Sequence, residues 1–201
     1  RGNDAVAIGH DSIANNTQTT AIGTSAKAIG EKATAFGFTA QANEEQSAAF
    51  GSGANAEGAF SSALGPASRA SNNATAIGYF AEANGNTSTA IGYGAKTNIS
   101  NATAVGGNHA KANGEGGSAF GSGANASGIN SVAIGRDAVS SDTNTTSLGY
   151  SAEATKQEAT ALGINATATG VNSTAVGTNS DATQLNATAM GVSRSEEHTS
   201  E

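Results

Sequence analysis

Apolar and polar positions alternate along this chain in a regular cycle. A bulky apolar residue followed by glycine recurs fourteen times, and eleven of the thirteen intervals between these pairs have the same length, fourteen positions. Small residues, mostly alanine, stand directly before the bulky residue and again four and six positions after it. Both halves of the cycle therefore have the period-two alternation of β-strands, not the 3.6-residue period of a helix.

The bulky residues are structural anchors of the repeat, one in each cycle. The residue before the anchor is Ala in thirteen cycles and Ser147 in the other, and Thr stands two positions before it in nine. The glycine after each anchor is the predicted bend residue, because glycine tolerates a positive φ and a close backbone approach. The anchors are Ile8, Ile22, Phe36, Phe50, Leu64, Ile77, Ile91, Val105, Phe120, Ile134, Leu148, Leu162, Val176 and Met190.

Each cycle reads as a strand, a tight bend, a second strand and a polar loop, which makes one coil of a β-solenoid. Burying one Ile-sized side chain stabilises by roughly 1.5–3 kcal/mol, whereas ordering a whole coil costs on the order of 20 kcal/mol. A single coil therefore cannot fold alone, and its strands must pair with the coils on either side. The sequence predicts an all-β fold, a parallel β-solenoid of about fourteen coils stacked as a rod.

Two coils depart from the regular pattern, and we expect both departures to fall in loops. The cycle that begins at Val105 carries one extra residue before its alanine pair, which places the insertion in the bend. Pro66 follows the anchor pair Leu64–Gly65, where its fixed φ is tolerated and its missing N–H is not needed for strand pairing. The first strand is predicted to stay intact in both coils.

The alternation also defines two faces on each strand. We expect the anchors to point into the roll, opposite the two second-strand alanines, and a smooth Ala/Ser/Thr strip to face outward. A flat small-residue surface of this kind predicts self-association around a symmetry axis. The variable residue between the two alanines would face solvent and form a candidate ligand-facing surface with the loops. Its residues are Lys27, Gln41, Asn55, Arg69, Glu82, Lys96, Asn125 and Glu153.

Composition alone would indicate a disordered chain. Of the 201 residues, 37% are apolar and 4% aromatic, 43 are alanine, and Ile, Leu, Val and Phe together number only 27. The anchors and alanines, however, recur at fixed positions of the cycle. The small number of large apolar residues therefore indicates a thin solenoid that folds by stacking of its coils. A net charge of −7, with nine basic residues spread singly, argues against nucleic-acid binding.

The chain starts at Arg1 with neither an initiating Met nor a signal-peptide pattern. We therefore expect an internal fragment, with any targeting or anchoring segment outside it. No apolar run approaches the roughly 20 residues of a membrane-spanning helix.

No constellation of residues predicts catalysis. No second histidine or carboxylate cluster stands at metal-ligand spacing from His10, His109 or His198. The glycine-rich stretches do not contain the lysine of a phosphate loop. No Gly-x-Ser-x-Gly elbow with a histidine partner is present. We predict a protein that is not an enzyme and has no catalytic, cofactor-binding or metal site.

Several units resemble the head repeat of trimeric autotransporter adhesins, the YadA-like heads. The units at 4–9, 73–78 and 130–135 carry the resemblance, the last with the sequence Asn-Ser-Val-Ala-Ile-Gly, and it extends over about residues 4–193. It implies a left-handed parallel β-roll, a homotrimer and display at the cell surface of Gram-negative bacteria. It also implies a role in virulence through adhesion to extracellular matrix proteins, host cells or other bacteria. Anchoring in the outer membrane would fall to a C-terminal region absent from this sequence.

The predicted head spans residues 1–193, and residues 194–201 break the repeat. This tail resembles the translation of a sequencing adapter, and a short natural linker is the alternative. Two other functions stay open for the repeat itself. An ice-binding solenoid would use the single Thr of each coil, although the Thr-x-Thr doublet is missing, and a purely structural spacer needs no ligand at all. Hexapeptide-repeat acyltransferases fit poorly, because their period of six does not divide fourteen.

Overall fold

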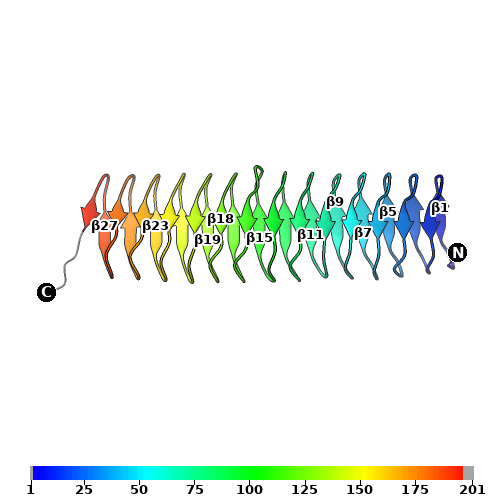
Figure 1. Cartoon of the computed structure of the whole chain (residues 1–201), viewed down its shortest axis with the longest axis horizontal. Coiled ribbons are helices and arrows are strands. Elements are labelled where there is room, and N and C mark those ends of the chain that lie inside the picture. The colour runs from blue at the N-terminus through cyan, green and yellow to red at the C-terminus, as the bar shows by residue number, and fades with distance from the viewer. Residues whose placement is uncertain (1, 197–201) are drawn as a thin grey trace. The chain divides into compact units, whose positions relative to one another are not determined.

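The computed structural model describes residues 2–196, and every regular element among them is a β-strand (Figure 1). The chain divides into two compact units, residues 1–101 and 102–201, and each is described by itself. Both are built from one repeating coil of a three-residue strand, a bend, a two-residue strand and a loop. This confirms the predicted all-β parallel solenoid, with coils of about fourteen residues.

The first unit contains seven coils and two sheets. Its first sheet follows the order β1 (Val6–Ile8), β3 (Thr20–Ile22), β5 (Thr34–Phe36), β7 (Ala48–Phe50), β9 (Ser62–Leu64), β11 (Thr75–Ile77) and β13 (Thr89–Ile91). Its second sheet follows the order β2 (Ile13–Ala14), β4 (Lys27–Ala28), β6 (Gln41–Ala42), β8 (Asn55–Ala56), β10 (Arg69–Ala70), β12 (Glu82–Ala83) and β14 (Lys96–Thr97).

The second unit repeats this arrangement with seven further coils. Its first sheet follows the order β15 (Thr103–Val105), β17 (Ser118–Phe120), β19 (Val132–Ile134), β21 (Thr146–Leu148), β23 (Thr160–Leu162), β25 (Thr174–Val176) and β27 (Thr188–Met190). Its second sheet follows the order β16 (Lys111–Ala112), β18 (Asn125–Ala126), β20 (Val139–Ser140), β22 (Glu153–Ala154), β24 (Thr167–Ala168), β26 (Asp181–Ala182) and β28 (Ser195–Glu196).

Strands pair in parallel with the equivalent strand of the next coil, and the register keeps each repeat position in one column. In the first sheet Thr75 lies beside Thr89 and Ile77 beside Ile91. Main-chain hydrogen bonds follow the same register, as between the Gly92 N–H and the Ile77 carbonyl at 2.7 Å. Every repeated side chain therefore has a like neighbour one coil away.

The space between the two sheets is filled by alanine, serine and threonine. In the coil of β12 and β13, the inward side chains are Ala81, Ala83, Ser88 and Ala90, each at most 1% exposed. The buried Ser88 hydroxyl donates to the Gly85 carbonyl at 2.7 Å, so its polar atom is satisfied. The core is a narrow layer with room for methyl and hydroxymethyl groups.

The predicted orientation of the anchors is wrong. Phe36 is 51% exposed and Ile77 38% exposed, whereas the alanine before each anchor, Ala35 or Ala76, is fully buried. The strand alternation is as predicted, but its inward face carries the small residues. Rows of small residues on the inner faces of both sheets let the two backbones approach closely. A row of bulky side chains pointing inward would force the sheets apart. The outer face of the first sheet is therefore a row of large apolar residues beside the threonines, and the smooth strip is the interior.

The bend glycines are required by their backbone and by the neighbouring coil. Gly78 has φ +128°, and a β-carbon there would lie 2.7 Å from the carbonyl oxygen of Gly92. Any side chain would meet both a backbone strain and a clash with the next coil. The bend role predicted for these glycines is confirmed.

The two irregular coils keep their strands, as expected. The extra residue after Val105 lies in the bend before β16, where Asn108 and His109 both have positive φ. Pro66 lies in the bend between β9 and β10. The residue missing from that coil is lost on the opposite edge, because the loop between β10 and β11 is one residue shorter than its counterparts.

Ser195 and Glu196, in the predicted tail, form β28, which pairs with Asp181 and Ala182 of β26. The boundary at residue 193 and the artificial origin of the tail stay predictions. Residues 197–201, and with them His198, lie outside the described residues.

Candidate functional site

The predicted ligand-facing residues occupy one position of the coil, on the outer side of the second sheet. In the first unit they form an unbroken column from β4 to β14, with successive members paired in register. That column contains Lys27, Gln41, Asn55, Arg69, Glu82 and Lys96. In the second unit Asn125 on β18 and Glu153 on β22 occupy the same position, with Val139 between them. Their binding of a ligand stays a prediction.

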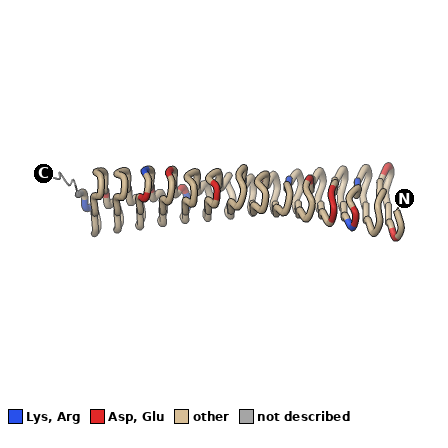
Figure 2. The backbone as a smooth tube through the Cα atoms, turned by 90° about the horizontal axis from the view of Figure 1, so that it is seen from below, with Lys and Arg blue, Asp and Glu red and all other residues tan. Residues whose placement is uncertain are grey.

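The column in the first unit contains two groups of interacting polar side chains. The Arg69 Nε lies 2.9 Å from the Glu57 Oε1, which also accepts a hydrogen bond from the Asn55 Nδ2 at 2.9 Å. Lys96 and Glu82 form a second ion pair. Figure 2 shows how sparsely charged residues are distributed along the backbone. Positive and negative groups therefore compensate locally, and this face has no field of one sign.

The Lys96 ammonium lowers the pKa of Glu82. A hydrogen bond from Lys96 is the largest cause, and its positive charge adds to the effect, while partial desolvation of the carboxylate opposes it. Smaller contributions in the lowering direction come from Asn84 and Arg69. Its neighbours thus keep Glu82 ionised to a lower pH than an ordinary glutamate.

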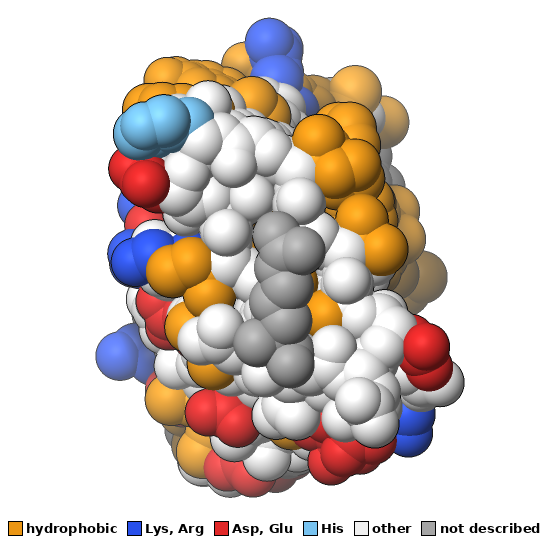
Figure 3. Space-filling view, turned by 90° about the vertical axis from the view of Figure 1, so that its right-hand side faces the viewer, with side chains coloured by type: hydrophobic (Ala, Val, Ile, Leu, Met, Phe, Trp, Pro, Cys, Tyr) orange, Lys and Arg blue, Asp and Glu red, His pale blue; other side chains and the backbone are white. Residues whose placement is uncertain are grey.

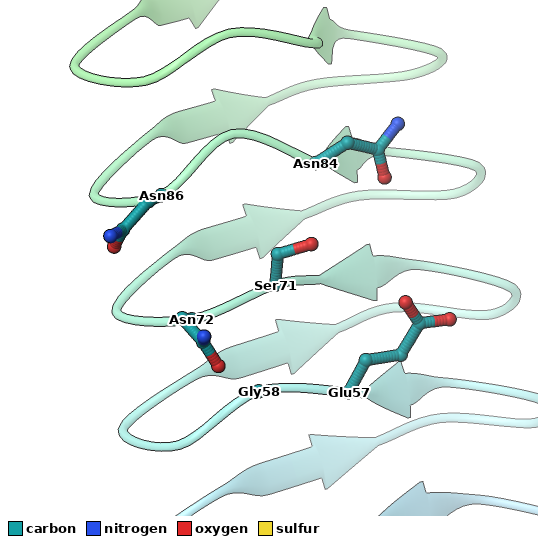
Figure 4. Close-up of a pocket in the computed structure, with 6 residues that line it drawn as sticks. All are labelled: Glu57, Gly58, Ser71, Asn72, Asn84 and Asn86. Carbon is teal, nitrogen blue, oxygen red and sulfur yellow. The ribbon is translucent and has the colours of Figure 1, made fainter.

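The short loop between β10 and β11 leaves a polar hollow of about 300 Å³ (Figure 4). Glu57, Ser71 and Asn72 line it from two successive coils, and Asn84 and Asn86 belong to the next coil. The Asn72 Oδ1 accepts a hydrogen bond from the Ala59 N–H at 3.1 Å. Figure 4 shows Asn84 and Asn86 directed to opposite sides. The hollow is open and its amides serve mainly to tie coils together.

A cluster of exposed aromatic rings was missed from the sequence. The Tyr79 ring packs edge-on against Phe80 with centroids 4.3 Å apart and stacks with Tyr93 at 5.8 Å. All three are about half exposed. The available signal was the recurrence of an aromatic residue two positions after the anchor, at Phe38, Tyr79, Tyr93 and Tyr150.

The outer face of the first sheet is the second candidate surface. Phe36 and Phe50 stack with ring centroids 6.3 Å apart and are 51% and 41% exposed. In the second unit Phe120, Ile134 and Leu148 are exposed at the same position. Figure 3, which looks at the N-terminal end, shows apolar side chains exposed at the upper right of this view, with further groups at other edges. Within each unit, an exposed apolar row of this kind marks a site of association.

Within residues 2–196, no group of three or more His, Asp or Glu side chains is placed to hold a metal ion. His10 pairs with Asp11, with the Nδ1 2.9 Å from the Oδ2, and both side chains are largely exposed. Over the same residues, no helix is long and apolar enough to cross a membrane.

Comparison with protein families gives a match to the YadA head domain repeat over residues 1–26, 28–54, 42–68, 56–81, 70–95, 83–108, 112–138, 126–152 and 154–180. These segments cover most of the chain. The chain belongs to the YadA head family. The family is non-enzymatic, as predicted.

Among solved structures, this chain is similar to the collagen-binding domain of the Yersinia adhesin YadA. The two are 24% identical, the match covers 74% of this chain and 73% of that domain, and the TM-score is 0.47. A search of curated proteins found none that matches.

Replacing Lys96 with glutamine is expected to raise the pKa of Glu82 toward its ordinary value of 4.5. Because the folded pKa is lowered, the stabilisation that Glu82 provides is present above its unfolded pKa. It is lost as the pH falls through the folded pKa. Side-chain NMR titration of Glu82 measures the first effect, and thermal unfolding at pH 7 and pH 3 measures the second. Lys27→Gln, in the same column but outside the ion pair, is the control. An unchanged Glu82 pKa in Lys96→Gln would contradict this account.

Proposed function

We propose that this chain is the head of a bacterial surface adhesin. It binds extracellular matrix proteins, host cells or other bacteria through many equivalent surface positions. The observation that carries this proposal is the repetition of one outward column over successive coils, in a member of an adhesin-head family. Family membership supports display at a bacterial surface.

The head acts as a homotrimer packed through the outer face of the first sheet. In one chain this face exposes anchors such as Phe36, Phe50 and Leu148 to water. Burial of apolar surface contributes about 25 cal/mol per Å², and a regular row along a repeat suits packing around an axis. We still propose the self-association expected from the sequence, but the contact surface is the row of anchors and not the strip of small residues.

Trimerisation leaves the outer face of the second sheet for ligand. The column of Lys27, Gln41 and Asn55 lies on the side of the coil opposite the anchors. Each contact there is weak, because exposed polar pairs contribute roughly 0–1 kcal/mol. Repetition over coils and across three chains raises the avidity through effective concentration.

The ice-binding alternative is less well supported. Ice binding needs a flat array, whereas Thr75 and Thr89 share their face with the bulky anchors Ile77 and Ile91. A structural spacer needs no ligand, so adhesion to immobilised matrix proteins or cells distinguishes it from an adhesin.

The double substitution Phe36→Ser and Phe50→Ser is expected to weaken trimer formation, because it removes two exposed rings from the anchor row without touching the alanine core. Light scattering measures the mass, which should be three times the 19.4 kDa of one chain for the unaltered protein and lower for the variant. Phe60→Ser, an equally exposed ring on a loop, is the control. If the unaltered chain is a monomer at micromolar concentration, the proposal is contradicted.

Removing residues 121–148 deletes two whole coils and joins Phe120 to Gly149 in the correct phase. We expect adhesion to immobilised matrix proteins and whole cells to fall sharply, because avidity depends on the number of contacts. Binding of one soluble copy of the same ligand should stay within about twofold, since the individual sites are unchanged. Equal adhesion by the shortened and full-length chains would argue for a single site and against multivalency.

A further inference from the structure

We propose that the hollow beside Phe80, on the outer face of the second sheet in the first unit, binds one neutral sugar residue. The hollow has a volume of about 180 Å³. Gly53, Ala67 and Phe80 line one part of it, and Asn55, Arg69 and Glu82 line the other. This inference rests on the proposed function, because it assigns a ligand class to part of the surface proposed for adhesion.

The hollow arises at the position three residues after the anchor, from the residues that occupy it in three successive coils. Thr39 occupies this position three coils before Phe80, and Gly53 and Ala67 occupy it in the two coils between them. Gly53 has no side chain and Ala67 only a methyl group, so the column is empty over two coils. The Phe80 ring closes the empty stretch at one end. These two small residues therefore leave a recess at a position where several other coils have larger turn residues.

Phe80 has an unusual backbone for an aromatic residue. Its φ is +54°, in the left-handed region, where bulky side chains are outliers. Asp11, Ser25 and Gly94 occupy the same position in other coils and suit this conformation better. The left-handed backbone recurs at this position, as at Thr39 (φ +53°) and Ala67 (φ +54°), so it belongs to the bend of the coil. The Phe80 ring itself is 50% exposed and lines the hollow.

Phe80 provides an apolar surface in the hollow and belongs to a cluster of three rings. Tyr79 lies edge-on to Phe80 and stacks with Tyr93, which fixes the orientation of the group. Exposed aromatic rings bind partners that have one flat apolar face and polar edges. A pyranose ring has this character, because its axial C–H groups form an apolar face and its hydroxyl groups lie around the edge.

The polar side of the hollow favours an uncharged ligand. Arg69 and Glu82 line the hollow, and each is paired with an opposite charge, Arg69 with Glu57 and Glu82 with Lys96, so the charges compensate one another. A phosphate or an ammonium group would find no excess of opposite charge. Guanidinium, amide and carboxylate groups together supply the donors and acceptors that sugar hydroxyls require.

The size of the hollow selects a single ring. Pockets for drug-sized ligands span about 300–1,000 Å³, and this one is smaller. It is also confined to three successive coils, whereas a bound peptide needs an extended groove. A terminal sugar on a glycan or glycoprotein fits these limits.

Saturation-transfer NMR on the full chain tests the site, with the methyl glycosides of glucose, galactose, mannose and N-acetylglucosamine as probes at millimolar concentration. At least one glycoside should bind, and Phe80→Ser should weaken it by about tenfold through loss of the ring contact. Serine occurs at this position as Ser25, so the variant keeps an accepted backbone. Ala67→Thr should abolish binding by filling the hollow, as Thr39 occupies the same position.

Phe60→Ser is the matched control, because Phe60 also has positive φ and a half-exposed ring but lies outside the hollow. Its affinity should equal that of the unaltered chain. The sugar site is overturned if none of the four glycosides binds. It is also overturned if Phe80→Ser and Ala67→Thr bind the glycoside as tightly as the unaltered chain does. Tighter binding of a proline-rich peptide at the same rings overturns it as well. If the chain adheres in the coil-deletion assay while no glycoside binds, this inference alone fails.

Discussion

The small separation of the two sheets is the constraint on which the other features of this chain depend. Interior positions are occupied by alanine, serine and threonine, and side chains such as Ala35, Ala76 and Ala90 are fully buried. Such a thin layer buries little apolar area per coil, so most of the stabilisation comes from pairing and stacking between coils. The glycine bends follow from the same closeness, because a β-carbon at Gly78 would meet the backbone of the next coil.

A thin interior also decides where the large side chains lie. The chain has 27 Ile, Leu, Val and Phe residues, and thirteen of them are anchors that point away from the core. A composition that would indicate disorder in an ordinary domain is therefore what this roll requires. The exposed anchor row supports the proposed trimer, and the polar column on the other sheet is left for ligand. One geometric limit thus separates an association face from a binding face.

The sequence was sufficient for the coil, the strands, the bends and the family, because one phase of the cycle repeats over almost the whole chain. It was not sufficient for the direction of the anchors. Period-two alternation separates two faces of a strand but does not say which is buried, and the usual preference for large residues inside favoured Ile77 over Ala76. The separation of the sheets resolves this. The recess beside Phe80 was also missed, since it depends on Gly53 and Ala67 being adjacent in space while a whole coil apart in the sequence.

Thermal unfolding of Ala76→Ile, followed by far-ultraviolet circular dichroism, tests the narrow interior most directly. Overpacking a closely packed core costs about 1–3 kcal/mol, and with sheets this close we expect the upper part of that range. We expect a clear fall in the unfolding midpoint or loss of the β-sheet signal. A variant that keeps both the midpoint and the spectrum of the unaltered chain would show that Ala76 faces outward, and would contradict the account.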